Sequence, residues 1–253
     1  MELNLNNPIA GRNTKTVYRD EDKTIKLFVE NYSKASVLNE ALIQSRVEEN
    51  TDLPISKLIE VRKIENRWAL ITEYIEGTPL NVLINEHPEK YDEYMNLFVD
   101  IQLEILSKRV PLLNRTKDKF IRKLTNTDKL DENTKYELLQ RIDGMKNHEK
   151  LCHGDFNPSN IIIKENGEYS IIDWAHATKG NASADVANTF LIFSMEGKNE
   201  MAEKYLELYC EKSGTDKKNI QIWIPIVAAI RKTYGKPEEQ EFLDKWTNIV
   251  DFQ

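Results

Sequence analysis

Apolar and polar positions alternate along the first 75 residues at the two-residue period of β-strands, with one helical stretch among them. The helical stretch starts after Ser33, a good helix-capping residue, and its apolar stripe continues to about Glu49. The strand-like runs are Thr16–Arg19, Thr24–Val29, Pro54–Val61 and Trp68–Tyr74. The pattern therefore predicts the order β-β-α-β-β.

The period changes to that of helices after residues 77–79. The longest amphipathic run is Pro88–Arg109. The other helical runs are Lys117–Leu124, Asn133–Met145, Ala184–Ser194, Glu196–Glu211, Asn219–Lys232 and Pro237–Ile249. This change predicts two domains, residues 1–75 and 76–253, joined by a short hinge at Glu73–Pro79 and not by a flexible linker.

Composition and charge narrow the class of protein. The chain has 253 residues, enough for one large domain or two lobes. Its formal net charge of −7 argues against a nucleic-acid-binding surface, which would be basic, and is compatible with a cationic small substrate. Two cysteines, Cys152 and Cys210, predict reduced thiols and a cytoplasmic protein. Neither a signal peptide nor a membrane-spanning run is expected from the apolar pattern.

Polar residues with catalytic potential gather between Cys152 and Asp173, in the sequence CHGDFNPSNIIIKENGEYSIID. His153, Asp155 and Asn160 have the spacing H-x-D-x-x-x-x-N, in which the Asp orients and deprotonates a hydroxyl and the Asn binds a metal ion. Asp and Asn also cap turns. The complete spacing, followed by Asp173, favours transfer of a phosphoryl group from a magnesium nucleotide.

A β-hairpin is predicted between Asn160 and Asp173. Ile161–Lys164 and Tyr169–Ile172 have strand character, and Glu165–Gly167 forms the turn, because Asn and Gly tolerate positive φ. Asp173 should then leave the second strand beside Asn160. Two oxygen ligands at the mouth of a hairpin suit magnesium, which takes few protein ligands and completes its shell with phosphates.

A cation for the nucleotide phosphates is expected in the first domain. Lys26 stands mid-strand in KTIKLF, so its side chain should point away from those of Ile25 and Leu27. Glu40, in the following helix, can hold that ammonium group. Lys23 is the alternative cation, and two acids near the helix end are alternatives to Glu40. A solvated Lys26 on an open strand face is the structural alternative.

The remaining nucleotide contacts are predicted from position along the chain. The loop AGRNTK contains one glycine, and its Asn13 and Thr14 could donate to phosphate; an ordinary turn is the alternative. Val17 could cover the adenine or belong to the core. The carbonyl of Glu73 and the N–H of Ile75 could pair with the adenine edge, because a departing strand leaves such groups unpaired.

With these residues in place, the chain resembles the aminoglycoside phosphotransferase and choline kinase-like superfamily, whose fold is similar to that of protein kinases. The matching segments are TVYRD, KTIKLF, the helix bearing Glu40, ITEYIEG, HGDFNPSN, and IIDW followed by Asp185. They span nearly the whole chain. The resemblance implies a bilobal α+β fold, with a small antiparallel β-sheet and one helix in the N-terminal lobe and a larger, mainly helical C-terminal lobe.

The resemblance also implies a role for each matched residue. Asp155 would act as the catalytic base, Asn160 and Asp173 would bind Mg²⁺, and Lys26 would contact the phosphates of ATP or GTP. Asp185 matches a buried aspartate that braces the catalytic loop; capping the following helix is its alternative role. His153 is expected to support the loop and not to act as the base.

The chain departs from protein kinases in two places. Asp173 is followed by Trp-Ala where D-F-G would stand, and no A-P-E segment follows, which disfavours an activation loop. Asn157 stands where many superfamily members have His. The single-glycine loop is typical of small-molecule kinases in this group.

The acceptor hydroxyl stays open at the level of sequence. An aminoglycoside is a polycation and would need carboxylates, and the acids available are Asp128, Asp131, Glu132, Glu137, Asp143, Glu196, Glu238 and Glu239. A quaternary ammonium substrate would need an aromatic cage, and the aromatics available are Trp174, Trp223, Tyr234 and Trp246. Neither pattern decides between these acceptors.

The sequence therefore predicts a small-molecule O-phosphotransferase, a cytoplasmic monomer or weak dimer that uses Mg²⁺ and ATP or GTP. An aminoglycoside is one candidate acceptor, and antibiotic resistance would follow from it. The alternatives are a choline, homoserine, thiamine or sugar kinase, and a nucleotide-binding pseudokinase with a regulatory role.

Overall fold

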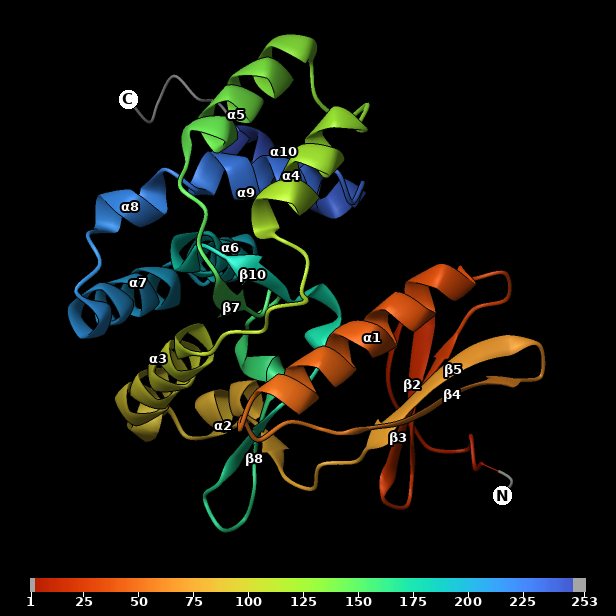
Figure 1. Ribbon diagram of the computed structural model, residues 1–253. Helices are drawn as coiled ribbons and strands as arrows, with labels where there is room; N and C mark the ends of the chain where they lie inside the picture. Colours follow the sequence, from red (N-terminus) through yellow and green to blue (C-terminus); the bar gives the residue numbers. More distant parts are fainter. Residues whose placement is uncertain (1–2, 248–253) are drawn as a thin grey trace. The chain divides into compact units, whose positions relative to one another are not determined.

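The computed structural model describes residues 3–247 and divides into two compact units (Figure 1). The first unit consists of the chain up to Pro88 together with Pro158–His176. The second consists of Glu89–Asn157 together with the chain from Ala177 onward. These units follow contacts and not chain order, and the nucleotide-binding lobe expected over residues 1–75 stays a prediction.

A five-stranded antiparallel sheet, in the order β1-β2-β3-β5-β4, forms the larger part of the first unit. Its strands are β1 (Pro8–Arg12), β2 (Lys15–Asp20), β3 (Lys23–Phe28), β4 (Leu58–Ile64) and β5 (Arg67–Glu73). Ile25 and Leu27 of β3 pack with Ala69 and Ile71 of β5 on one face. The two-residue period of β3 therefore turns Lys26 to the opposite face.

Helix α1 (Lys34–Asn50) covers that opposite face of the sheet (Figure 1). The Ser33 side chain caps it by accepting a hydrogen bond from the Ser36 N–H at 3.3 Å. Val37 and Ala41 are buried against Phe28 of β3. This packing fixes which side of α1 faces the sheet, and so fixes the position of Glu40.

A second, three-stranded sheet in the order β6-β8-β9 completes the first unit. Its elements, with the short helices beside it, are β6 (Thr78–Pro79), α2 (Leu80–Glu86), η2 (Pro158–Asn160), β8 (Ile161–Ile163), β9 (Tyr169–Ile171) and η3 (Trp174–His176). β8 and β9 form the predicted hairpin. Gly167 has φ +84° in its turn, where the Lys164 N–H donates to the Glu168 carbonyl at 2.8 Å.

Helices make up most of the second unit, which also contains one two-stranded sheet. Its elements are α3 (Tyr91–Ser107), α4 (Thr116–Thr125), α5 (Glu132–Gly144), β7 (Lys150–Cys152), β10 (Thr178–Gly180), α6 (Ala182–Met195), α7 (Asn199–Ser213), α8 (Lys217–Gln221), α9 (Ile224–Lys232) and α10 (Pro237–Thr247). A one-turn 3₁₀ helix, η1 (Pro88–Lys90), precedes α3. α6 is buried from Ala182 to Ser194. Phe98 of α3 packs on the rings of Phe156, Phe193 and Tyr205.

The predicted α+β class is confirmed, while several element boundaries differ from prediction. The strand expected over Pro54–Val61 begins only at Leu58, because Ile55 bridges Ile171 of the other sheet. The run expected over Asn219–Lys232 is two helices, α8 and α9. The predicted end of the last helix, at Ile249, lies outside the described residues. Across residues 3–247, no helix is long and apolar enough to span a membrane.

Candidate functional site

A lysine held by two carboxylates lies at the centre of the first unit. The Nζ of Lys26 is 2.8 Å from Oε1 of Glu40 and 2.8 Å from Oδ1 of Asp173. Burial by itself lowers the pKa of Lys26, but the charges of Asp173 and Glu40 outweigh it and raise that pKa above its usual value. The ammonium group therefore stays charged and in one place, as a phosphate-binding cation requires.

Asp173 follows β9 in the left-handed backbone region, with φ 60°. Lys15 on β2 approaches its other oxygen, with Nζ 3.7 Å from Oδ2. Burial would raise the pKa of Asp173, but the charges of Lys26 and Lys15 hold it well below its usual range. Sequence reasoning did not single out Lys15. The available signal was its place two residues before Val17, which turns both side chains to one face of β2.

Asn160 is buried next to Asp173 along the hairpin. The Asn160 carbonyl accepts a hydrogen bond from the Ile172 N–H at 3.0 Å, so the residue before Asp173 is tied to Asn160. Among residues 3–247, no three His, Cys, Asp or Glu side chains are grouped as an all-protein metal site. One carboxylate and one amide fit a Mg²⁺ ion that completes its shell with phosphate and water oxygens.

The other predicted nucleotide contacts of the first unit lie on or beside the five-stranded sheet. Asn13 and Thr14 are exposed at the tip of the β1–β2 hairpin, so the predicted loop is a turn between two strands. Val17 is half-buried and pairs directly with Lys26, so the two side chains share one face of the sheet.

The predicted adenine-binding groups follow the end of β5. The sequence predicts an unpaired Glu73 carbonyl, but this carbonyl accepts a hydrogen bond from the Ser56 Oγ at 2.7 Å. A carbonyl oxygen has two lone pairs, so one acceptor position is left. Ile75 is half-buried two residues further on.

The segment His153–Asn157 of the second unit is a tightly bonded loop. The Asp155 N–H donates to Nδ1 of His153 at 3.3 Å, and the Asp155 carbonyl accepts from Nδ2 of Asn157 at 2.9 Å. Gly154 has φ +79°, a conformation that glycine adopts without strain. His153 is fully buried and Asp155 half-buried. The loop therefore presents Asp155 from a fixed backbone.

Asp185 of α6 braces this loop by hydrogen bonds to its backbone. Its carboxylate accepts the N–H groups of Gly154 at 2.7 Å and His153 at 3.3 Å. Burial raises the pKa of Asp185, and the N–H donor of Gly154 opposes that shift. The helix cap is Asn181, whose side chain accepts from the Ser183 N–H at 2.8 Å, so Asp185 does not have the capping role.

Two more side chains of α6 support the loop and were missed by sequence reasoning. The Asn188 Nδ2 donates to the Gly154 carbonyl at 3.2 Å, and the Thr189 Oγ1 donates to the Phe156 carbonyl at 2.8 Å. Both residues are buried, three and four positions after Asp185. Polar residues at this spacing in a largely apolar helix were the available signal, because they share one helical face.

The acids proposed for a polycationic acceptor do not gather at this loop. Seven of the eight are exposed, and Glu239, which is half-buried, pairs with Arg231 at 3.4 Å and Lys236 at 2.7 Å. The four proposed cage aromatics are each engaged by the protein: Trp174 and Trp223 are buried, Trp246 packs on Phe190, and Tyr234 carries the Nζ of Lys123 over its ring at 3.9 Å. These positions support neither a carboxylate-lined pocket nor a cage.

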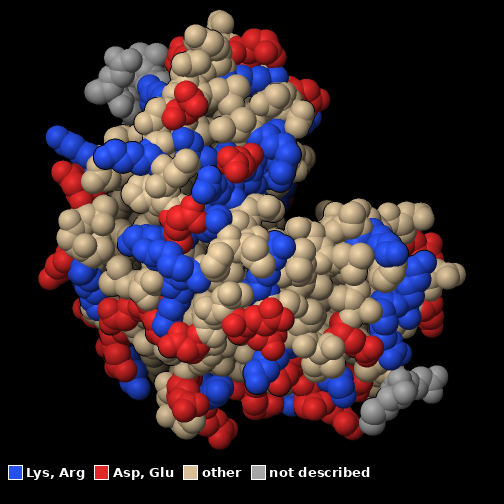
Figure 2. Space-filling model, in the orientation of Figure 1, with Lys and Arg blue, Asp and Glu red and all other residues tan. Residues whose placement is uncertain are grey.

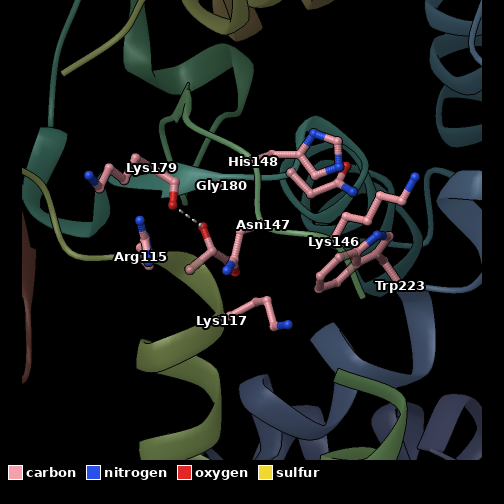
Figure 3. A pocket seen from close by; sticks show the side chains of 10 residues that line it. Arg115, Lys117, Lys146, Asn147, His148, Lys179, Gly180 and Trp223 are labelled. Atoms are coloured by element: carbon pink, nitrogen blue, oxygen red, sulfur yellow. Dashed lines mark hydrogen bonds between the residues drawn. The ribbon is translucent and has the colours of Figure 1, made fainter. Parts of the chain in front are cut away.

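A small basic crevice lies where α4 begins, beside β10 (Figure 3). Its volume of about 10 Å³ is close to that of one water molecule. Arg115 and Lys179 both pair with Glu149, at 3.0 and 2.8 Å, and Lys117 donates to the Met145 carbonyl at 2.6 Å. Because these cations are engaged by the protein, the crevice anchors the start of α4.

Comparisons with known proteins agree with this geometry. The chain matches the profile of the phosphotransferase enzyme family over residues 7–219. No curated protein matches the chain.

Solved structures with the same fold include several kinases. Aminoglycoside phosphotransferase APH(3'')-Id from Streptomyces rimosus, bound to ADP and streptomycin, has 17% identity and a TM-score of 0.60, covering 85% of this chain and 90% of that one. Choline kinase LicA from Streptococcus pneumoniae has 16% identity and a TM-score of 0.64, covering 97% and 91%. A thermostable mutant of APH(4)-Ia, bound to ADP and hygromycin B, has 12% identity and a TM-score of 0.69, covering 94% and 89%.

The structural neighbours confirm the predicted kinase-like fold. Together with the family profile, they also confirm the resemblance to aminoglycoside phosphotransferases and choline kinases. The profile covers most of the chain, including the loop with Asp155 and the hairpin with Asp173. The chain therefore belongs to the phosphotransferase enzyme family.

Proposed function

We propose that this protein is a small-molecule O-phosphotransferase, which moves the γ-phosphate of ATP or GTP to a hydroxyl of a small acceptor. The observation that carries the proposal is the buried Lys26 held at 2.8 Å by both Glu40 and Asp173. A structural core has little use for an ammonium group between two carboxylates, since burying these charges costs free energy. A nucleotide-binding site requires such an ammonium group, because the cation must contact the phosphates at a fixed position.

The proposed roles follow from the two units taken separately. Asp155, on the loop braced by Asp185, takes the proton of the acceptor hydroxyl. The acceptor oxygen forms a bond to the γ-phosphorus, and the bond from that phosphorus to the β–γ bridging oxygen breaks, which releases ADP or GDP. Lys26 contacts the donor phosphates. Asn160 and Asp173 would hold Mg²⁺, which neutralises phosphate charge when bound.

The test removes the base and keeps its shape. In Asp155→Asn we expect turnover to fall by about 10²- to 10⁴-fold or more, because general-base catalysis contributes about this much. Nucleotide affinity, measured by calorimetry, should stay within a few-fold of wild type. The assay is nucleotide consumption, with ATP and GTP compared, across aminoglycosides, choline, thiamine, homoserine and sugars.

The control is Asp128→Asn, which removes an exposed acid outside the loop. It should leave turnover unchanged. Unchanged turnover in Asp155→Asn would overturn the assignment of the base. Tight nucleotide binding with no acceptor-dependent consumption by the wild type would instead indicate a nucleotide-binding regulator.

A further inference from the structure

Lysine and arginine side chains gather over α4 (Figure 2). This ten-residue helix carries Lys117, Lys119, Arg122 and Lys123, against the single acid Asp118. It belongs to the second unit, as does the loop with Asp155. The helix is therefore positively charged, whereas the whole chain has a net charge of −7.

The cations of α4 divide into two groups. Lys117, at the start, is engaged by backbone carbonyls of the Asp143–Met145 segment. Lys119 and Lys123 lie two and six residues after Lys117 and share a face with each other, because residues four apart are neighbours on a helix. Phe120 packs edge-on against Trp223, with ring centres 6.5 Å apart, which fixes the orientation of that face.

Lys123 is held on the aromatic ring of Tyr234. Tyr234 belongs to the segment that follows α9, and the Nζ of Lys123 lies 3.9 Å from the centre of its ring. The ring attracts the ammonium group and so positions it. Burial and the charge of Arg122 lower the pKa of Lys123. The lysine is therefore presented at a defined place.

The Lys119–Lys123 face is electrostatically linked to the loop with Asp155. Burial and the charge of Lys123 lower the pKa of Lys119 to about 8, while the carboxylates of Asp185 and Asp155 oppose that shift. Burial raises the pKa of Tyr234, and the charge of Asp155 contributes in the same direction. A bonded path runs beside them, from Arg231 to Asn188 at 3.2 Å and from Asn188 to the Gly154 carbonyl at 3.2 Å.

This face is unsuited to a polycation. Lys119, which the charge of Asp155 influences, and Lys123 would repel each ammonium group of an aminoglycoside. The half-buried acid of this region, Glu239, already pairs with Arg231 and Lys236. An anionic group would reverse the balance, because it would offset the mutual repulsion of Lys119, Arg122 and Lys123.

From this arrangement we infer that the acceptor carries an anionic group, a carboxylate or a phosphate, close to its reactive hydroxyl, and that Lys119 and Lys123 bind it. The inference rests on the proposed function, since it names the acceptor class of the same reaction. It places the hydroxyl toward Asp155 and the anion toward α4.

The first experiment compares acceptors that differ only in charge. The panel contains glucuronate, glucose and glucosamine, then glycerol phosphate, glycerol and aminopropanediol, with streptomycin and choline as cations. We expect nucleotide consumption to be highest with the anionic member of each set, and kcat/KM for it to fall as ionic strength rises. Preference for glucosamine, streptomycin or choline would overturn the inference.

The second experiment measures binding without turnover. Glucuronate and glycerol phosphate are titrated into the protein in the absence of nucleotide, and the dissociation constant is compared between variants. Lys119→Gln and Lys123→Gln should each weaken binding of the preferred anion about tenfold or more, because each removes a charged partner. Lys123→Arg should retain binding, because it keeps the cation.

The matched control is Lys204→Gln, which removes a lysine of α7 paired with Asp92 at 3.0 Å. It should bind the anion as the wild type does. Equal anion affinity in wild type and Lys119→Gln, or no anion binding by the wild type, would overturn the inference.

If Asp155→Asn abolishes consumption with a cationic acceptor, the proposed function stands and the anionic acceptor fails. If the lysine variants lose anion binding but no acceptor is phosphorylated, the binding face stands and the phosphotransferase assignment fails.

Discussion

At the scale of single residues, the Lys26–Glu40–Asp173 group consists of charges that can be buried only because they are paired with one another. Lys26 is 14% exposed and Asp173 27% exposed, so both give up much of their hydration. Their short contact, with Glu40 as a second anion, compensates for that loss. Removing Lys26 takes the shared cation from both carboxylates, so the free energy of unfolding should fall.

Lys26→Met removes the shared cation of this group. We expect the free energy of unfolding to fall by about 3–5 kcal/mol, the usual cost of leaving a buried charge unpaired. Urea denaturation at neutral pH measures it. Lys23→Met, which loses only an ion pair to the exposed Asp22, should cost at most about 1 kcal/mol. Similar losses in both variants would contradict the assignment of Lys26.

The pKa of Asp173 makes a second residue-level prediction. Because that pKa is depressed in the folded protein, its stabilising effect is present above the unfolded carboxyl pKa of about 4 and is lost as pH falls through the lower folded value. Wild-type stability should therefore decline below about pH 4, by up to about 1.4 kcal/mol per pH unit for this group. The decline should be shallower in Asp173→Asn. Parallel curves from urea denaturation between pH 2 and 7 would refute the prediction.

At the scale of elements, short strands and helix ends are set by neighbours and not by their own sequence. β7 and β10 have three residues each, too few for an alternating pattern to be recognised. They exist because they pair with each other, and α4 is tied to β10 through Thr116. The long runs behind α1 and α3 were predicted because their periodicity extends over several turns. The start of α1 is an exception, because the Ser33 side chain accepts from a backbone N–H only three residues on, and such a cap is predictable from local sequence.

The contact of α4 with β10 leaves no space at Gly180. A Cβ there would overlap the Oγ1 of Thr116, which also bonds the Thr178 hydroxyl at 2.8 Å. Gly180→Ala should therefore lower the free energy of unfolding by about 1–3 kcal/mol. Thermal and urea denaturation measure the loss.

A double-variant cycle separates this contact from a general backbone effect. Thr116→Gly removes both overlapping atoms, Oγ1 and Cβ, so the combined variant should lose less than the two single losses added together. Gly144→Ala, where a Cβ meets open space, should cost little or nothing. Simple additivity in the cycle would show that the overlap does not set the cost.

At the scale of the whole molecule, both cysteines are unpaired but differ in setting. Cys152, at the end of β7, is buried, and Cys210 of α7 is half-buried. Burial raises the pKa of the Cys152 thiol well above its usual value and raises that of Cys210 as well. Since the thiolate is the reactive form, the folded protein should protect Cys152 most strongly.

Thiol titration at about pH 8 tests how completely the fold closes over Cys152. We expect one thiol to react in the native protein and two in urea, with the second appearing along the unfolding transition. Cys210→Ser should abolish the native reaction. Two thiols of equal reactivity in the native protein would contradict the burial of Cys152.

The sequence by itself determined the chemistry that lies within short reach along the chain. His153, Asp155 and Asn160 are related by spacing, and Asp173 follows from the hairpin turn, because a few residues of backbone leave little freedom in how such groups can lie. The sequence proposed Glu40 for Lys26 and Asp185 for the loop, each with an alternative, and the tertiary structure decided between them. Only the tertiary structure added Asp173 as a second partner of Lys26 and the electrostatic link of Lys119 to Asp155. Those pairings join residues between 14 and 147 positions apart. Their energies depend on burial and distance, which no local pattern encodes.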